Sequence, residues 1–164
     1  MMDLNKNKMI EQSERLRFLV DVVKQEIKHL NFSDKRVFTE ALTTERAMSL
    51  TADEVLAEKI EAFGSRFGRL QDTIGDKLLP LWLSAIGEKT AAFVDNLNKA
   101  EKLNTLTSAE RWMEIRLLSN KMVHEYIKDY RIFAEALQSA HEHIPFVILF
   151  AENIMQDITT RKLC

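Results

Sequence analysis

Cysteine, proline and glycine are all scarce in this chain of 164 residues. The only cysteine is Cys164, which excludes an intrachain disulfide and a zinc site built on several thiolates. The chain has two prolines and four glycines, too few for the many turns of a β-sandwich or barrel. The composition therefore predicts long helices with few connections, and the single thiol favours a reducing compartment.

The sequence also lacks a strong net charge and a long apolar run. Lys and Arg number 23 against 25 Asp and Glu, so nothing global attracts nucleic acid, and RNA contact would need a local patch. The longest apolar run, residues 145–151, is far shorter than the roughly 20 residues that span a bilayer. The polar N-terminal segment also lacks the apolar stretch of a secretory signal. We therefore expect a cytoplasmic protein with no membrane association, formed by a single domain over residues 1–164.

Apolar residues recur at three- and four-residue steps, the spacing that puts them on one face of a helix. These stripes predict long helices over about 9–29, 51–75, 109–126 and 130–160, and shorter helices over 77–86 and 88–103. Ser108 is placed to cap the helix that begins at Ala109, and Pro145 predicts a kink in the last one. The predicted fold class is therefore all-α, an up-and-down helical bundle of about five long helices.

The second long helix carries further local signals. Thr51 is followed three residues later by Glu54, the pattern of a capping box, so the helix is predicted to start there. Gly75 is the predicted end. Gly64 and Gly68 lie one turn apart inside the helix, and we expect another backbone to approach them closely, with a hinge as the alternative.

A polar line marks the helix predicted over 109–126. At about 100° per residue, Arg116, Asn120, His124 and Lys128 fall in one polar line, and a second, largely apolar line begins at Trp112. Cations hold a phosphate, and an imidazole that titrates near neutrality can pass protons to or from a hydroxyl. The line is therefore a candidate phosphate site, although the solvated outer face of any bundle helix produces similar lines.

Two segments of this helix carry a family resemblance. Residues 108–116 (SAERWMEIR) and 120–126 (NKMVHEY) resemble the signature helix of HEPN-domain proteins, especially the HepT-like partners of minimal nucleotidyltransferases. The earlier phrase RLQD, residues 69–72, is similar to a recurrent feature of that group. The resemblance implies a HEPN-like bundle that forms a homodimer with its signature helices facing each other. It also implies a toxin–antitoxin module in which the HEPN protein is a metal-independent RNase and its partner is a minimal nucleotidyltransferase.

The resemblance also assigns roles to single residues. His124 matches the catalytic histidine, Tyr126 the tyrosine that receives AMP from the partner, and Asn120 the polar residue that follows the family's arginine. The arginine itself is absent, because Ser119 stands five residues before His124 and serine has no charged fork to grip a phosphate. Arg116, one turn upstream, is the candidate substitute. Further candidates for phosphate or RNA binding are Lys121, Lys128 and Arg69, and Asp72 is a candidate for orienting a neighbouring side chain.

Three functional interpretations follow. The first is a HEPN-like toxin that cleaves RNA with a degenerate motif, and the second is a non-catalytic substrate-binding or docking subunit of a minimal nucleotidyltransferase. The third is a structural interaction domain whose polar line is merely solvated. No cofactor or metal is expected, since His141 and His143 are two residues apart with no third ligand of suitable spacing nearby. The sequence also shows no glycine-rich phosphate loop or nucleophile elbow.

Overall fold

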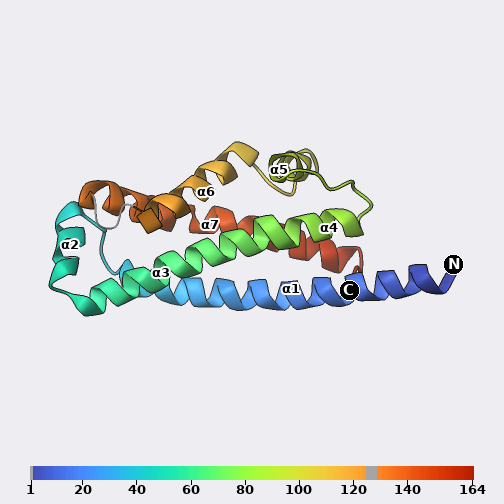
Figure 1. Cartoon of the computed structure of the whole chain (residues 1–164), viewed down its shortest axis with the longest axis horizontal. Coiled ribbons are helices and arrows are strands. Elements are labelled where there is room, and N and C mark those ends of the chain that lie inside the picture. Colours follow the sequence, from blue (N-terminus) through green and yellow to red (C-terminus); the bar gives the residue numbers. More distant parts are fainter. Residues whose placement is uncertain (1, 125–128) are drawn as a thin grey trace. The chain divides into compact units, whose positions relative to one another are not determined.

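The computed structural model describes residues 2–124 and 129–164, and the regular structure in these ranges is entirely helical (Figure 1). The all-α prediction is confirmed. The α-helices are α1 (Met2–Val37), α2 (Thr44–Met48), α3 (Glu54–Asp72), α4 (Leu79–Ala85), α5 (Phe93–Lys102), α6 (Ala109–His124) and α7 (Tyr130–Thr160). A 3₁₀ turn, η1 (Ser49–Thr51), precedes α3, and a π-helical segment, η2 (Thr73–Leu78), joins α3 to α4.

The helices form two compact units. The unit that contains most of α6, called here the α6 unit, comprises Glu26–Gln71 and Glu110–Val147. The other, called here the terminal unit, comprises Met1–Gln25, Asp72–Ala109 and Ile148–Cys164. The single domain over residues 1–164 stays a prediction. Within the described residues, none of the helices combines the length and the apolar character needed to cross a bilayer.

The core of the α6 unit is built on the predicted stripes. On α3, Phe63 and Phe67 are fully buried with their ring centroids 6.2 Å apart, and Phe38 meets Phe63 edge-on at 5.2 Å. On α6, Trp112, Ile115 and Met122 of the apolar line are also buried. The α7 residues that were expected on one face are all buried: Phe133, Leu137, Ala140, Ile144 and Val147.

The terminal unit has its own buried centre. The indole of Trp82 on α4 is almost completely buried, and its Nε1–H donates to Oδ2 of Asp157 on α7 over 2.8 Å. The same carboxylate accepts from Nε of Arg161, one turn later. Pairing the buried indole donor with a carboxylate satisfies a group that would otherwise be costly to bury.

The start of α3 differs from the prediction. Thr51 lies in η1, where its hydroxyl donates back to the carbonyl of Met48 over 3.3 Å. The capping side chain is instead Asp53, whose Oδ1 accepts from the backbone N–H of Leu56 at 3.0 Å. The predicted capping box was therefore wrong, because a carboxylate directly before the helix captures the first exposed N–H groups.

The glycines of this region also behave differently from the prediction. The chain does not leave the helix at Gly75, which is buried within η2 and continues into α4. A Cβ placed on Gly64 or Gly68 would meet no atom within 4 Å, so the expected close approach of another backbone was wrong. The chain turns only at Gly87, whose φ of 84° favours a residue without a Cβ.

Other helix limits also differ from the prediction, and helix α1 begins at Met2 rather than near residue 9. Helix α1 continues to Val37 because the fully buried residues Leu16, Val23 and Leu30 repeat at seven-residue steps that reach it. Helix α5 starts at Phe93 rather than near Glu88. The buried side chain of Asn96 accepts from the N–H of Ala91 at 2.9 Å and donates to its carbonyl at 3.2 Å, which occupies the backbone groups that a longer helix would need.

The cap assignment predicts a measurable difference between two adjacent polar residues. Asp53→Ala should lower the free energy of unfolding by about 1 kcal/mol through loss of the N-cap bond, whereas Thr51→Ala should change it by less than about 0.5 kcal/mol. Denaturant unfolding of the two variants measures both values. Asp53→Asn is the matched control and should stay close to the wild type, since asparagine caps equally well. A larger loss for Thr51→Ala than for Asp53→Ala would contradict the assignment.

Candidate functional site

Helix α6 begins where the sequence predicts. The backbone N–H of Ala109, one of the unpaired donors of the first turn, donates to Oε2 of Glu101 at 2.6 Å. Trp112 and Ile115 are completely buried and Met122 is nearly so, which fixes the rotation of the helix. On the polar line Arg116 is half-buried and Asn120 is exposed.

Part of the candidate site lies beyond what the structure describes. His124 is the last residue of α6, so its backbone continues the line of Arg116 and Asn120. The side chain of His124 lies outside the described part of the chain, as do Tyr126 and Lys128 entirely. The alignment of Arg116, Asn120 and His124 therefore follows from the helical backbone alone.

Ser119, at the position where the family resemblance expects an arginine, is half-buried. Its hydroxyl donates to Oε1 of Gln71 on α3, at a long 3.4 Å. Gln71 is only 1 % exposed, and its Nε2 has no hydrogen-bond partner among the described residues. Ser119 thus faces the packed side of α6, where a serine fits and a charged guanidinium would lose its hydration.

The other predicted phosphate-binding residues are dispersed. Lys121 is exposed on α6. Arg69 is exposed on α3, where its Nη2 donates weakly to Oγ of Ser65 one turn earlier, over 3.4 Å. Asp72 is exposed and belongs to the terminal unit. Among the described candidates, Arg116, Asn120 and Lys121 share α6, while Arg69 and Asp72 lie about one turn apart on α3.

A cluster that sequence reasoning missed joins α6 to α7. The guanidinium of Arg111 lies over the ring of Phe146, with its carbon 4.4 Å from the ring centroid. Its Nε and Nη2 approach Nδ1 of His143 at 3.2 and 3.1 Å. Burial, and next the charge of Arg111, lower the pKa of His143 from 6.5, against the opposing effect of Glu114 and Glu142. The imidazole is therefore held neutral, as an acceptor for arginine.

His141 has a different environment, as the two-residue spacing predicts. Its Nδ1 is 2.6 Å from Oδ1 of Asp34, and its ring stacks on Phe38 with centroids 4.1 Å apart. Its neighbours therefore belong to residues 34–38, whereas those of His143 lie on α6 and α7. Within the described ranges, no three or more His, Cys, Asp or Glu side chains are grouped to hold a metal ion.

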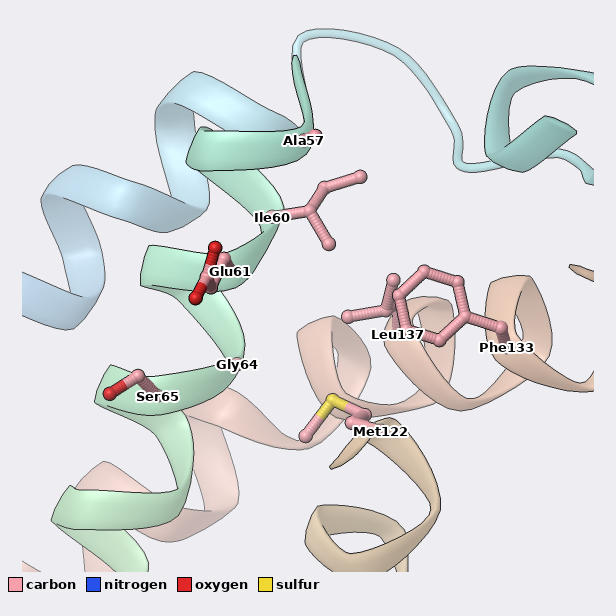
Figure 2. Close-up of a pocket in the computed structure, with 8 residues that line it drawn as sticks. All are labelled: Ala57, Ile60, Glu61, Gly64, Ser65, Met122, Phe133 and Leu137. Carbon is pink, nitrogen blue, oxygen red and sulfur yellow. The ribbon is translucent and has the colours of Figure 1, made fainter. Parts of the chain in front are cut away.

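A pocket of about 460 Å³ opens next to the end of α6, within the α6 unit (Figure 2). Figure 2 shows Ile60 of α3 facing Phe133 and Leu137 of α7, with Met122 of α6 beside them and the oxygens of Glu61 and Ser65 along α3. The remaining lining residues are Ala57 and Gly64. The missing side chain of Gly64 leaves this wall of α3 open, which explains the glycine better than a close backbone approach.

No protein-family model, curated protein or solved structure matches this chain. The HEPN resemblance consequently depends on the sequence of α6 and on the RLQD phrase of α3. The candidate site on this evidence is the outer face of α6, formed by Arg116, Asn120 and Lys121 with His124 at its end.

The lowered pKa of His143 predicts a pH dependence. The unfolded chain binds a proton near pH 6.5, whereas the folded chain binds it only at lower pH, so the folded state loses stability as pH falls below about 6.5. His143→Gln should remove part of that loss in denaturant unfolding. In an NMR titration Arg111→Gln should raise the pKa of His143, while the exposed control His29→Gln leaves it unchanged. A wild-type pKa at or above 6.5 would contradict this account.

Proposed function

We propose that this chain is a HEPN-like component of a toxin–antitoxin module and acts there as the non-catalytic docking subunit of a minimal nucleotidyltransferase. It forms a homodimer, its outer α6 face docks the nucleotidyltransferase, and Tyr126 accepts AMP from that enzyme. The observation that carries the proposal is the contact between Ser119 and the buried Gln71, which commits the arginine position of the motif to packing.

The physical basis is the difference between serine and arginine at that position. RNA cleavage without a metal needs a cation to stabilise the negative charge that develops on the phosphate. The forked guanidinium supplies this charge with fixed geometry, whereas a neutral hydroxyl that already donates to Gln71 supplies none. The function that best fits such a site is a subunit that still binds its nucleotidyltransferase partner but no longer cleaves RNA.

The exposed face of α6 supports a docking role. Leu117 is 59 % exposed, and Lys121 follows it one turn later on the same side of the helix. Asn120 lies beside them and is also exposed. An apolar side chain bordered by an amide and a cation is the composition of a protein interface with a polar rim.

The second candidate function, RNA cleavage, is favoured by the half-buried Arg116. It precedes Asn120 by one helical turn and His124 by two, so the three residues align along the α6 backbone. In this case Arg116 replaces the missing motif arginine and holds the phosphate, while the imidazole of His124 moves the proton. Two subunits facing each other would supply two imidazoles, one as acid and one as base.

Incubation with tRNA in EDTA separates the two candidates. We expect the wild-type protein to cleave no faster than His124→Ala, because the site lacks the motif cation. Ser119→Arg restores the motif cation and so tests whether its absence prevents cleavage. Any cleavage that this variant gains should disappear in Ser119→Arg/His124→Ala. Wild-type cleavage that is lost in both His124→Ala and Arg116→Ala would overturn the docking proposal and establish the RNase.

Co-expression with a nucleotidyltransferase encoded next to this chain tests docking itself. Leu117→Asp should reduce the amount of partner recovered by about tenfold, since an interface residue that loses about 1.4 kcal/mol costs that factor. Val94→Asp is the matched control, an equally drastic change of an exposed apolar residue on α5. Mass spectrometry should show AMP on the peptide with Tyr126 and none in Tyr126→Phe. Failure of the wild-type chain to bind any such partner would refute the proposal.

A further inference from the structure

A second hollow lies in the α6 unit, between the last turns of α1 and the first half of α3. It has a volume of about 240 Å³ and is called here the α1–α3 hollow. Its lining residues are Phe32, Ser33, Arg36, Val55, Glu58, Lys59, Ala62 and Arg66. The small side chains of Ser33 and Ala62 leave space between the helices, while Phe32 and Val55 remain 57 % and 62 % exposed.

The charge of this hollow differs from that of the chain. Three cations, Arg36, Lys59 and Arg66, line it against one carboxylate, that of Glu58, although the whole chain has a net charge of −2. No ion pair within the described residues engages any of the three cations. Cations that lie close together without ion pairs repel one another, and a bound anion would reduce that repulsion.

Arg66 is held in place before any ligand arrives. Its Nη1 donates to Oγ of Ser33 at 2.6 Å and to the carbonyl oxygen of His29 at 3.2 Å. Ser33 is only 4 % exposed, so this anchor lies in the floor of the hollow. Both bonds use the same nitrogen, which leaves Nε and Nη2 without a hydrogen-bond partner among the described residues. This edge of a guanidinium is the one that binds two oxygens of a phosphate.

An aromatic ring accompanies the cations. The guanidinium carbon of Arg36 lies 5.4 Å from the centroid of the Phe32 ring, a cation–π contact that holds the arginine at the rim. Phe32 and Val55 expose apolar surface on the two helices that border the hollow. The hollow thus offers cationic groups for an oxyanion and apolar surface for an organic group attached to it.

We propose that the α1–α3 hollow is a binding site for a small organic phosphate. The phosphate lies against Arg66 and Lys59, with Arg36 closing the third side, and the organic group rests on Phe32 and Val55. The site uses no residue of the α6 face and stands whether or not the chain docks a nucleotidyltransferase.

Titration of the full chain with phenyl phosphate tests the proposal by NMR. Shifts at the hollow should saturate with a dissociation constant below about 1 mM, whereas inorganic phosphate should bind about tenfold more weakly because it lacks the ring. Binding should weaken as salt is added. Shifts that do not saturate by about 10 mM, or equal affinity for the two probes, would overturn the proposal.

Adjacent residues of opposite charge provide the decisive variants. Lys59→Gln should weaken phenyl phosphate binding by about tenfold, while Glu58→Gln should strengthen it by about threefold, because each changes the charge at the hollow by one unit in opposite directions. Lys35→Gln is the matched control, an exposed α1 cation that does not line the hollow, and should leave the affinity within about twofold. Equal losses for Lys59→Gln and Lys35→Gln would show general charge attraction and refute a defined site.

Filling the hollow is an independent test that alters no charge. Ala62→Leu should abolish phenyl phosphate binding, since the added atoms occupy the space between the helices. Thermal unfolding checks that this variant folds, and the cation variants stand on their own if it does not. A folded Ala62→Leu protein with wild-type affinity would refute the location of the site.

Discussion

The burial of one face of α3 is the constraint on which the α6 unit depends. Phe63 and Phe67 have no exposed surface, and fixing them fixes the rotation of the helix. That rotation also sets where the polar residues of α3 lie. Gln71 is directed to Ser119 of α6, and Arg66 is directed to Ser33 of α1. Moving the aromatic pair would displace both polar contacts, so the candidate sites rest on the same packing that stabilises the unit.

Two hydrogen-bonded polar contacts lie close to this core. The amide of Gln71 is buried and accepts from Ser119, and the neutral imidazole of His143 accepts from Arg111. Neither contact places an uncompensated charge in the interior, although the buried Nε2 of Gln71 lacks a partner among the described residues and so costs stability. In the proposed HEPN motif, residue 119 is the position of the arginine that RNA cleavage requires. Serine at this position makes a packing contact with Gln71 and supplies no charge.

Two hollows described above in the α6 unit have contrasting chemistry and lie on different sides of α3. The larger is walled by Ile60, Met122, Phe133 and Leu137 and has Glu61 as its charged lining residue. The smaller is lined by an excess of cations around Ser33. A chain that is nearly neutral overall is thus locally uneven in charge, and the proposed phosphate binding depends on side-chain placement rather than on net charge.

The sequence by itself determined the helices and their buried faces. Apolar residues at four- and three-residue steps were sufficient to predict helices α3 and α7 and their buried faces. The period of a helix is a local property, so the spacing of apolar residues along the sequence reveals it. The cap at Asp53 was missed since neighbouring Thr51 offers a similar pattern, and Gly75 was misread because a wide π turn absorbs it. Only tertiary structure decided which polar residues meet. Arg111 and His143 are 32 residues apart and Arg66 and Ser33 are 33 apart, and their contacts depend on how helices rotate and pack, which no local spacing encodes.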